Sequence, residues 1–114
     1  MLHPLTTAQS LRLWHDVGLA QVKHDEPDLS LRQITILLSV YLEPPPHTVR
    51  ALAAKLIVSK PVITRALDAM GKQGLLTRRR DDADRRNVLI QRTVGGSLYL
   101  ERLADLVSAT SQGL

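Results

Sequence analysis

Five arginines and three aspartates lie within nine residues, between Arg78 and Arg86. Guanidinium groups pair with phosphates and enter the narrow minor groove of DNA, where the negative potential is enhanced. A neighbouring aspartate can hold a guanidinium in one direction by charge-assisted hydrogen bonds. One interpretation is a polyanion-binding segment in which Asp81 or Asp84 orients Arg85 and Arg86. The other is a solvated surface cluster of weak ion pairs.

Positive charge is concentrated in the middle of the chain. Residues 50–92 carry eleven Lys or Arg and four acids, whereas residues 1–49 carry three bases and five acids. The formal net charge of +4 therefore understates the local excess. A basic centre between acidic flanks favours a nucleic acid as the partner.

Enzymatic and metal chemistry find little support in the sequence. The chain has no cysteine, which excludes disulfides and Cys-ligated zinc. Its four histidines, at 3, 15, 24 and 47, have no metal-ligand spacing. The segment "GKQG" at 71–74 lacks the spacing and the preceding strand of a P-loop. We expect no enzyme activity, no cofactor and no metal. No signal peptide or membrane-spanning apolar stretch is visible, which predicts a cytoplasmic protein without a membrane partner.

The elements that must position the charged segment are short helices. Capping residues and apolar spacing predict helices over about 7–23, 31–42 and 49–56, and a fourth from Lys60 to a stop at Gly74. The capping residues would be Thr6 or Thr7, Ser30, Thr48 and Ser59. The stiff loop "EPPPH" at 43–47 is too short for a domain linker.

The third and fourth helices, joined by a tight turn, predict a helix-turn-helix. The fourth would face inward with Ile63, Ala66, Leu67 and Met70. Its outward residues would include Asp68 and Lys72, which are spaced for an i, i+4 ion pair. In this motif the N-terminal half of the second helix enters the major groove. Together with the arginine-rich segment, this predicts the DNA-binding residues Ser59, Lys60, Pro61, Thr64, Arg65, Arg79, Arg85 and Arg86.

After Gly74 the pattern changes to short aliphatic runs. Residues 75–79 and 87–92 predict two strands, and the polar residues between them predict a charged tip. A last helix is expected over about 96–109, starting at Gly95 and Gly96. The predicted fold class is therefore mainly α with a small β-hairpin wing (α+β): one winged helix-turn-helix domain over 1–114. It divides into an N-terminal helix (about 1–29), a core (30–95) and a C-terminal helix (96–114).

Apolar surface at both ends of the chain exceeds what one small domain can easily bury. This predicts a homodimer built from the first and last helices. The expected interface residues are Leu11, Trp14, Leu100, Leu103 and Val107. The alternative is that these faces only close the core of a monomer.

The stretch from Thr48 to Gly96 resembles the DNA-binding core of the MarR family of bacterial transcription regulators. The family's wing pattern is matched in register by Asp81, Asp84, Arg85, Arg86, Thr93 and Gly96. The resemblance implies that Arg86 enters the minor groove and that the fourth helix reads base edges. It thereby implies a DNA-binding transcription regulator.

Three residues depart from the family pattern. Asp82 replaces the usual wing proline, Arg92 replaces an apolar residue, and Ile57 stands where many relatives have glycine. A different function remains open, namely a winged helix adaptor that binds a protein and not a specific DNA site. Small-molecule control is not favoured, because aromatic residues make up only 3% of the chain.

Overall fold

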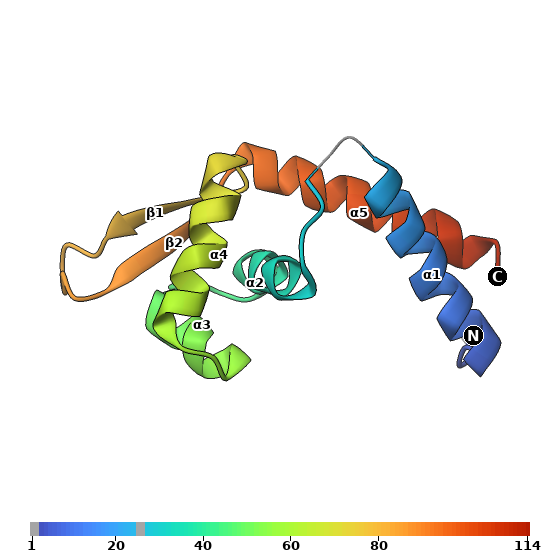
Figure 1. Cartoon of the computed structure of the whole chain (residues 1–114), viewed down its shortest axis with the longest axis horizontal. Helices are drawn as coiled ribbons and strands as arrows, with labels where there is room; N and C mark the ends of the chain where they lie inside the picture. The colour runs from blue at the N-terminus through green and yellow to red at the C-terminus, as the bar shows by residue number, and fades with distance from the viewer. Residues whose placement is uncertain (1–2, 25–26) are drawn as a thin grey trace. The chain divides into compact units, whose positions relative to one another are not determined.

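The structure is a computed structural model that describes residues 3–24 and 27–114. Its elements in chain order are α1 (Thr7–Lys23), α2 (Leu31–Leu42), α3 (Val49–Leu56), α4 (Lys60–Lys72), β1 (Leu76–Arg80), β2 (Val88–Arg92) and α5 (Val94–Gln112) (Figure 1). Residues 29–100 form one compact unit, here called the winged helix unit. The described residues of 1–28 form a second unit with residues 101–114.

Local hydrogen bonds start the first three helices where the sequence predicts them. Thr6 and Ser30 each form a reciprocal capping box with the glutamine three residues later. The Thr48 hydroxyl accepts a hydrogen bond from Ala51 N at 3.0 Å. The predicted chain break at 25–28 lies partly outside the described residues, but α1 ends at Lys23 as expected.

Ser59 occupies the N-cap position of α4, but its side chain makes no capping hydrogen bond. The prediction of a capping hydroxyl is therefore wrong, and the adjacent residues explain why. An N-cap side chain normally bonds the backbone N–H of the second or third helical residue. Here the second is Pro61, which has no N–H, and the third, Val62, donates to the Ser59 carbonyl oxygen at 3.1 Å.

The turn between α3 and α4 keeps a left-handed backbone without glycine. Ile57 has φ 56° and ψ 51° and an exposed side chain. The following residue, Val58, donates its N–H to the Ala53 carbonyl oxygen at 3.0 Å. A β-branched residue is strained in this conformation, so the departure from glycine has an energetic cost.

The core of the winged helix unit lies where α2, α3, α4 and the hairpin meet. Fully buried side chains include Ile36 and Leu37 from α2 and Ile63 and Met70 from α4. The four inward residues predicted for α4 are all buried, and α4 ends at Lys72, before Gly74 with φ 73°. The apolar spacing therefore identified the buried face of α4 correctly.

The hairpin is antiparallel, with the register running from Leu76 opposite Arg92 to Arg80 opposite Val88. Its second strand also pairs with the residues before α3. Ile90 N donates to the His47 carbonyl oxygen at 2.9 Å, and Thr48 forms a bridge with Leu89. This connection places the start of α3 beside β2 of the wing.

The last helix begins two residues earlier than predicted and ends three residues later, at Gln112. Thr93 precedes it and accepts a hydrogen bond from Gly96 N at 3.0 Å. Both glycines lie within its first turn and not before it. A Cβ at Gly96 would overlap the Tyr41 hydroxyl and the Leu75 carbonyl oxygen. These glycines therefore allow close packing and do not mark the start of the helix.

Arg92, the second departure from the family pattern, has a structural role. Its Nε donates to the Val40 carbonyl oxygen at 3.1 Å, and its guanidinium lies 5.5 Å from the centre of the Tyr41 ring. The Tyr41 hydroxyl in turn bonds both the N–H and the carbonyl of Thr93, at 2.9 and 2.8 Å. The C-terminal end of α2 is thus tied to the start of α5.

Candidate nucleic-acid interface

The N-terminal half of α4 exposes polar side chains opposite its buried face. Lys60, Pro61 and Arg65 are exposed, and Thr64 is half-buried. Ser59 is also exposed, at the preceding turn. The predicted recognition residues therefore share one accessible region, while Ile63, Ala66, Leu67 and Met70 hold the helix in the core.

Asp68 does not form the predicted pair with Lys72. Its carboxylate instead accepts a hydrogen bond from Arg78 Nη2 at 2.6 Å. The turn after α4 directs β1 back along the helix, and this brings Arg78 beside Asp68. The ion pair joins the recognition helix to the first strand of the wing.

The wing holds one arginine in a fixed orientation. Arg86 Nε and Nη2 donate to the two carboxylate oxygens of Asp84, each at 3.0 Å. Asp84 Oδ1 also accepts from Arg86 N at 3.1 Å. The Arg86 guanidinium, and then its backbone N–H, lower the pKa of the Asp84 carboxyl below its ordinary value of 3.8. The pair is exposed, so it orients a charge that remains accessible to a partner.

The other acids of the wing have different roles. The Asp81 carboxylate accepts a hydrogen bond from Ala83 N at 3.0 Å and shapes the backbone of the tip. Among the described residues Asp81 makes no ion pair with an arginine, so Asp84 is the one of the two predicted orienting acids that contacts Arg86. Asp82 Oδ1 lies 3.8 Å from Arg85 Nη1, and both side chains are largely exposed. Asp84 therefore supplies the short, two-point carboxylate–arginine pairing of the tip.

The remaining wing arginines differ in direction. Arg78 and Arg80 pair with Ile90 and Val88 in the hairpin register, so they share the face that includes the buried Ile90. Arg79 pairs with Leu89 and projects from the other face. Arg80 Nη1 donates to the Arg85 carbonyl oxygen at 3.1 Å and closes the tip. Arg85 and Arg79 are exposed, as expected for DNA-binding residues.

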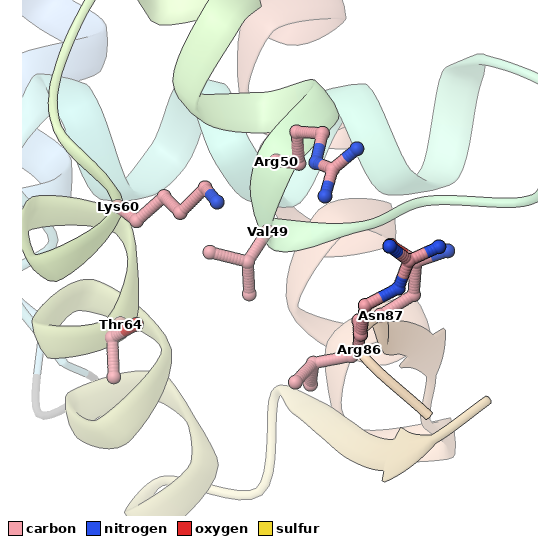
Figure 2. Close-up of a pocket in the computed structure, with 7 residues that line it drawn as sticks. Val49, Arg50, Lys60, Thr64, Arg86 and Asn87 are labelled. Atoms are coloured by element: carbon pink, nitrogen blue, oxygen red, sulfur yellow. The ribbon is translucent and has the colours of Figure 1, made fainter. Parts of the chain in front are cut away.

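A cleft of about 180 Å³ lies between α3, α4 and the wing, at the end of β2 that is next to the tip. Figure 2 shows the side chains around it: Arg50 from the first turn of α3, Lys60 and Thr64 from α4, and Arg86 and Asn87 from the wing. Val49 and Val88 complete the lining. None of these seven residues is acidic, so this basic cleft is suited to an anion.

Arg50 and Asn87 were missed by sequence reasoning. Arg50 contributed to the basic central segment, but its position on α3 gave no sign that it would face the wing. The pairing of Thr48 with Leu89 brings the two together. That pairing joins residues 41 positions apart and leaves no local pattern in the sequence.

Comparison with known proteins agrees with this geometry. The sequence profile described as "MarR family" matches residues 29–88. The chain belongs to the MarR family. Over 59 residues it is 37% identical to the organic hydroperoxide resistance transcriptional regulator of Bacillus subtilis (strain 168). The match covers 52% of this chain and 40% of that relative, so the chain spans less than half of the relative's length.

Solved structures of MarR-like regulators share the fold. The transcriptional repressor CouR, solved bound to a 23-mer DNA duplex, superposes with a TM-score of 0.72 and 27% identity. The match covers 93% of this chain and 72% of CouR. The regulator Tm0710 from Thermotoga maritima gives a TM-score of 0.76 at 22% identity, covering 91% of this chain and 70% of that one. These matches confirm the mainly α fold with a small hairpin wing.

MarR family membership also supports the expectation that the chain is a regulator and not an enzyme. Within residues 3–24 and 27–114, no cluster of His, Cys, Asp and Glu could hold a metal ion. In the same part of the chain, no helix has the length and apolar character needed to cross a bilayer.

The residues predicted to form a dimer differ in exposure. Trp14, Leu11 and Val107 expose 73%, 66% and 37% of their surface. Leu103 is half-buried, and Leu100 packs against the core of the winged helix unit. Leu100 is therefore already used within the chain, which makes it the weakest of the five interface predictions.

Proposed function

We propose that this MarR-family chain is a sequence-specific double-stranded DNA-binding transcription regulator. In this proposal α4 lies in the major groove and the wing delivers Arg86 into the adjacent minor groove. The observation that carries it is the pair of hydrogen bonds from the Arg86 side chain to Asp84, which holds an exposed guanidinium in one orientation. A guanidinium is well suited to a narrow minor groove. A regulator of bacterial genes works beside the chromosome, so the cytoplasm is the proposed location.

The exposed residues of α4 would make two kinds of contact, with base edges and with phosphates. Arg65 can present two parallel N–H groups to guanine O6 and N7, and Thr64 can contact a thymine methyl group. Ser59, Lys60 and Pro61 lie at the N-terminal end of the helix, where backbone N–H groups favour phosphate. Arg79 and Arg85 would contact phosphates beside the wing and supply affinity without sequence preference.

A binding site selected from a randomised duplex library would test the proposal. We expect fluorescence anisotropy to show tighter binding to the selected duplex than to a scrambled duplex of equal length and composition. Arg86→Ala should weaken binding and flatten any preference for A·T-rich flanks. Equal affinity for selected and scrambled DNA would refute sequence-specific regulation and favour a protein-binding adaptor.

We further propose that the chain acts as a homodimer through α1 and the C-terminal part of α5. This is supported by three exposed apolar side chains, Trp14 and Leu11 on α1 and Val107 on α5. Exposed apolar surface of this kind is typical of a face that binds another protein chain. Two-fold symmetry would place two half-sites about 10 bp apart. A small-molecule effector is not part of this proposal.

Sedimentation of the wild type at tens of micromolar should show a dimer, and Trp14→Arg should shift it toward a monomer. Leu42→Arg is the matched control, since it changes an equally exposed apolar residue of the winged helix unit. A wild-type monomer that binds one DNA site per chain would overturn the dimer proposal and leave DNA recognition in place.

A further inference from the structure

The basic cleft has a position that matters for any duplex read by both α4 and the wing. A major groove and its adjacent minor groove are separated by one sugar–phosphate backbone. A protein with a helix in one groove and a wing in the next must therefore straddle that backbone. The residues between the helix and the wing then face its phosphates. In this chain, those residues line the cleft shown in Figure 2.

We infer that Arg50, with Lys60 and Asn87, holds one phosphate of the DNA strand that passes between α4 and the wing. This inference rests on the proposed DNA-binding function and adds Arg50 of α3 and Asn87 to the DNA contacts proposed above. Arg50 and Lys60 supply positive charge from two helices, and Asn87 supplies an amide donor from the wing. The valines at 49 and 88 contribute apolar surface to the lining.

The surrounding ion pairs leave the cleft free for an anion. Asp84, the wing acid two residues before Arg86, does not line the cleft, and its carboxylate is held by Arg86. The pKa of Asp84 is lowered mainly by Arg86 and to a smaller extent by the charge of Arg50. Arg50 therefore lies close enough to the wing for its charge to act on Asp84. Among the described residues, no carboxylate forms an ion pair with Arg50.

A phosphate contact has a definite signature. Each phosphate that a protein neutralises contributes about 0.9 to the slope of log affinity against log salt concentration. Loss of one such contact lowers affinity by about fivefold at 0.15 M salt and about fifteenfold at 0.05 M salt, if counterion release is its whole contribution. A phosphate carries no sequence information, so selected and scrambled duplexes should lose affinity equally.

The test compares Arg50→Ala with Arg32→Ala. Both arginines are exposed and occupy the second position of a helix, but Arg32 does not line the cleft. We expect Arg50→Ala to lower affinity for both duplexes by the factors above for each protomer bound, and to reduce the salt slope by about one. Arg32→Ala should change either quantity much less. Thermal unfolding of both variants should match that of the wild type.

The phosphate that Arg50 contacts can be located with a series of duplexes, each of which carries one neutral methylphosphonate at a different position. The wild type should lose affinity at each phosphate that the protein contacts, and at one of these positions per half-site Arg50→Ala should lose much less than the wild type does. Additive losses at every position would overturn the inference. So would equal effects of the two arginine variants, or a loss confined to the selected duplex, which would make Arg50 a base-reading residue. Wild-type protein that binds no duplex specifically would instead refute the proposed function itself.

A second arm separates DNA phosphate from a free phosphorylated ligand. Inorganic phosphate replaces chloride at constant ionic strength during the DNA titration. We expect the affinity to be unchanged at millimolar phosphate, because one phosphate lacks the adjoining strand that both helices and the wing contact. Competition in the wild type that disappears in Arg50→Ala would show that the cleft serves a free anion, and would overturn the DNA assignment.

Discussion

Replacement of Asp84 by alanine distinguishes an orienting carboxylate from a simple counter-charge. Asp84 receives three hydrogen bonds from Arg86, and two of them fix the guanidinium. Without Asp84, the Arg86 side chain would regain its rotamer freedom and would lose it again on binding. Fixing every rotamer of an arginine costs an entropy that corresponds to about a thirtyfold loss of affinity. If Asp84 removes half of that cost before binding, its loss should weaken binding about fivefold for each wing.

The opposing effect is electrostatic. Removing a carboxylate from the wing also removes its repulsion of DNA, and this alone would tighten binding at low salt. Asp82→Ala measures that electrostatic effect, because Asp82 is two residues away and lies 3.8 Å from its nearest arginine nitrogen, that of Arg85. The difference between the two variants is then the contribution of orientation.

Anisotropy titrations of both variants at 0.05 and 0.3 M salt provide the measurement. We expect Asp82→Ala to bind more tightly than the wild type at low salt, with the gain lost at high salt. Asp84→Ala should bind about fivefold more weakly than Asp82→Ala at both concentrations. Equal affinities of the two variants would refute the orienting role, even if both differed from the wild type.

The pH dependence of Asp84 provides an independent check. Arg86 lowers the pKa of the folded Asp84 carboxyl below 3.8, so the pair contributes stability above that pH. The contribution is lost as the pH falls through the lower, folded value. We therefore expect the carboxyl carbon of Asp84 to titrate below pH 3.8 by NMR, and to titrate higher in Arg86→Ala. An unchanged midpoint would show that the pair is not formed in solution.

Three further substitutions test the recognition helix and the fold. Arg65→Ala should lower affinity for the selected duplex by about five- to 150-fold, and for scrambled DNA much less, in anisotropy titrations. Equal losses on the two duplexes would show that Arg65 contacts only phosphate. Gly96→Ala should lower the free energy of unfolding in urea by about 1–3 kcal/mol, because its Cβ would overlap Tyr41 and Leu75. The control Gly18→Ala has nothing within 4 Å and should stabilise α1, so equal changes would contradict the packing argument. Ile57→Gly should raise the free energy of unfolding by up to about 1 kcal/mol, since it relieves a φ of 56° at an exposed site, and a loss of stability would show that the turn is not strained.

The sequence alone determined the local elements and the buried face of α4. Capping boxes begin α1 and α2 at Thr6 and Ser30, and apolar residues repeat with the period of a helix. These signals act over three or four residues, so they can be detected without knowledge of the fold. The wing pattern was identified for the same reason, because Asp84 and Arg86 are only two residues apart.

Only the tertiary structure decided which distant residues meet. Asp68 contacts Arg78 across a turn, Arg92 reaches the Val40 carbonyl from 52 residues away, and Gly96 packs against Tyr41. The basic cleft likewise depends on the pairing of Thr48 with Leu89, which brings Arg50 beside the wing. Such contacts result from the packing of α2, α3 and α4 against the hairpin. A charged side chain has several partners of suitable chemistry along the chain, and only this packing selects the one that lies within reach.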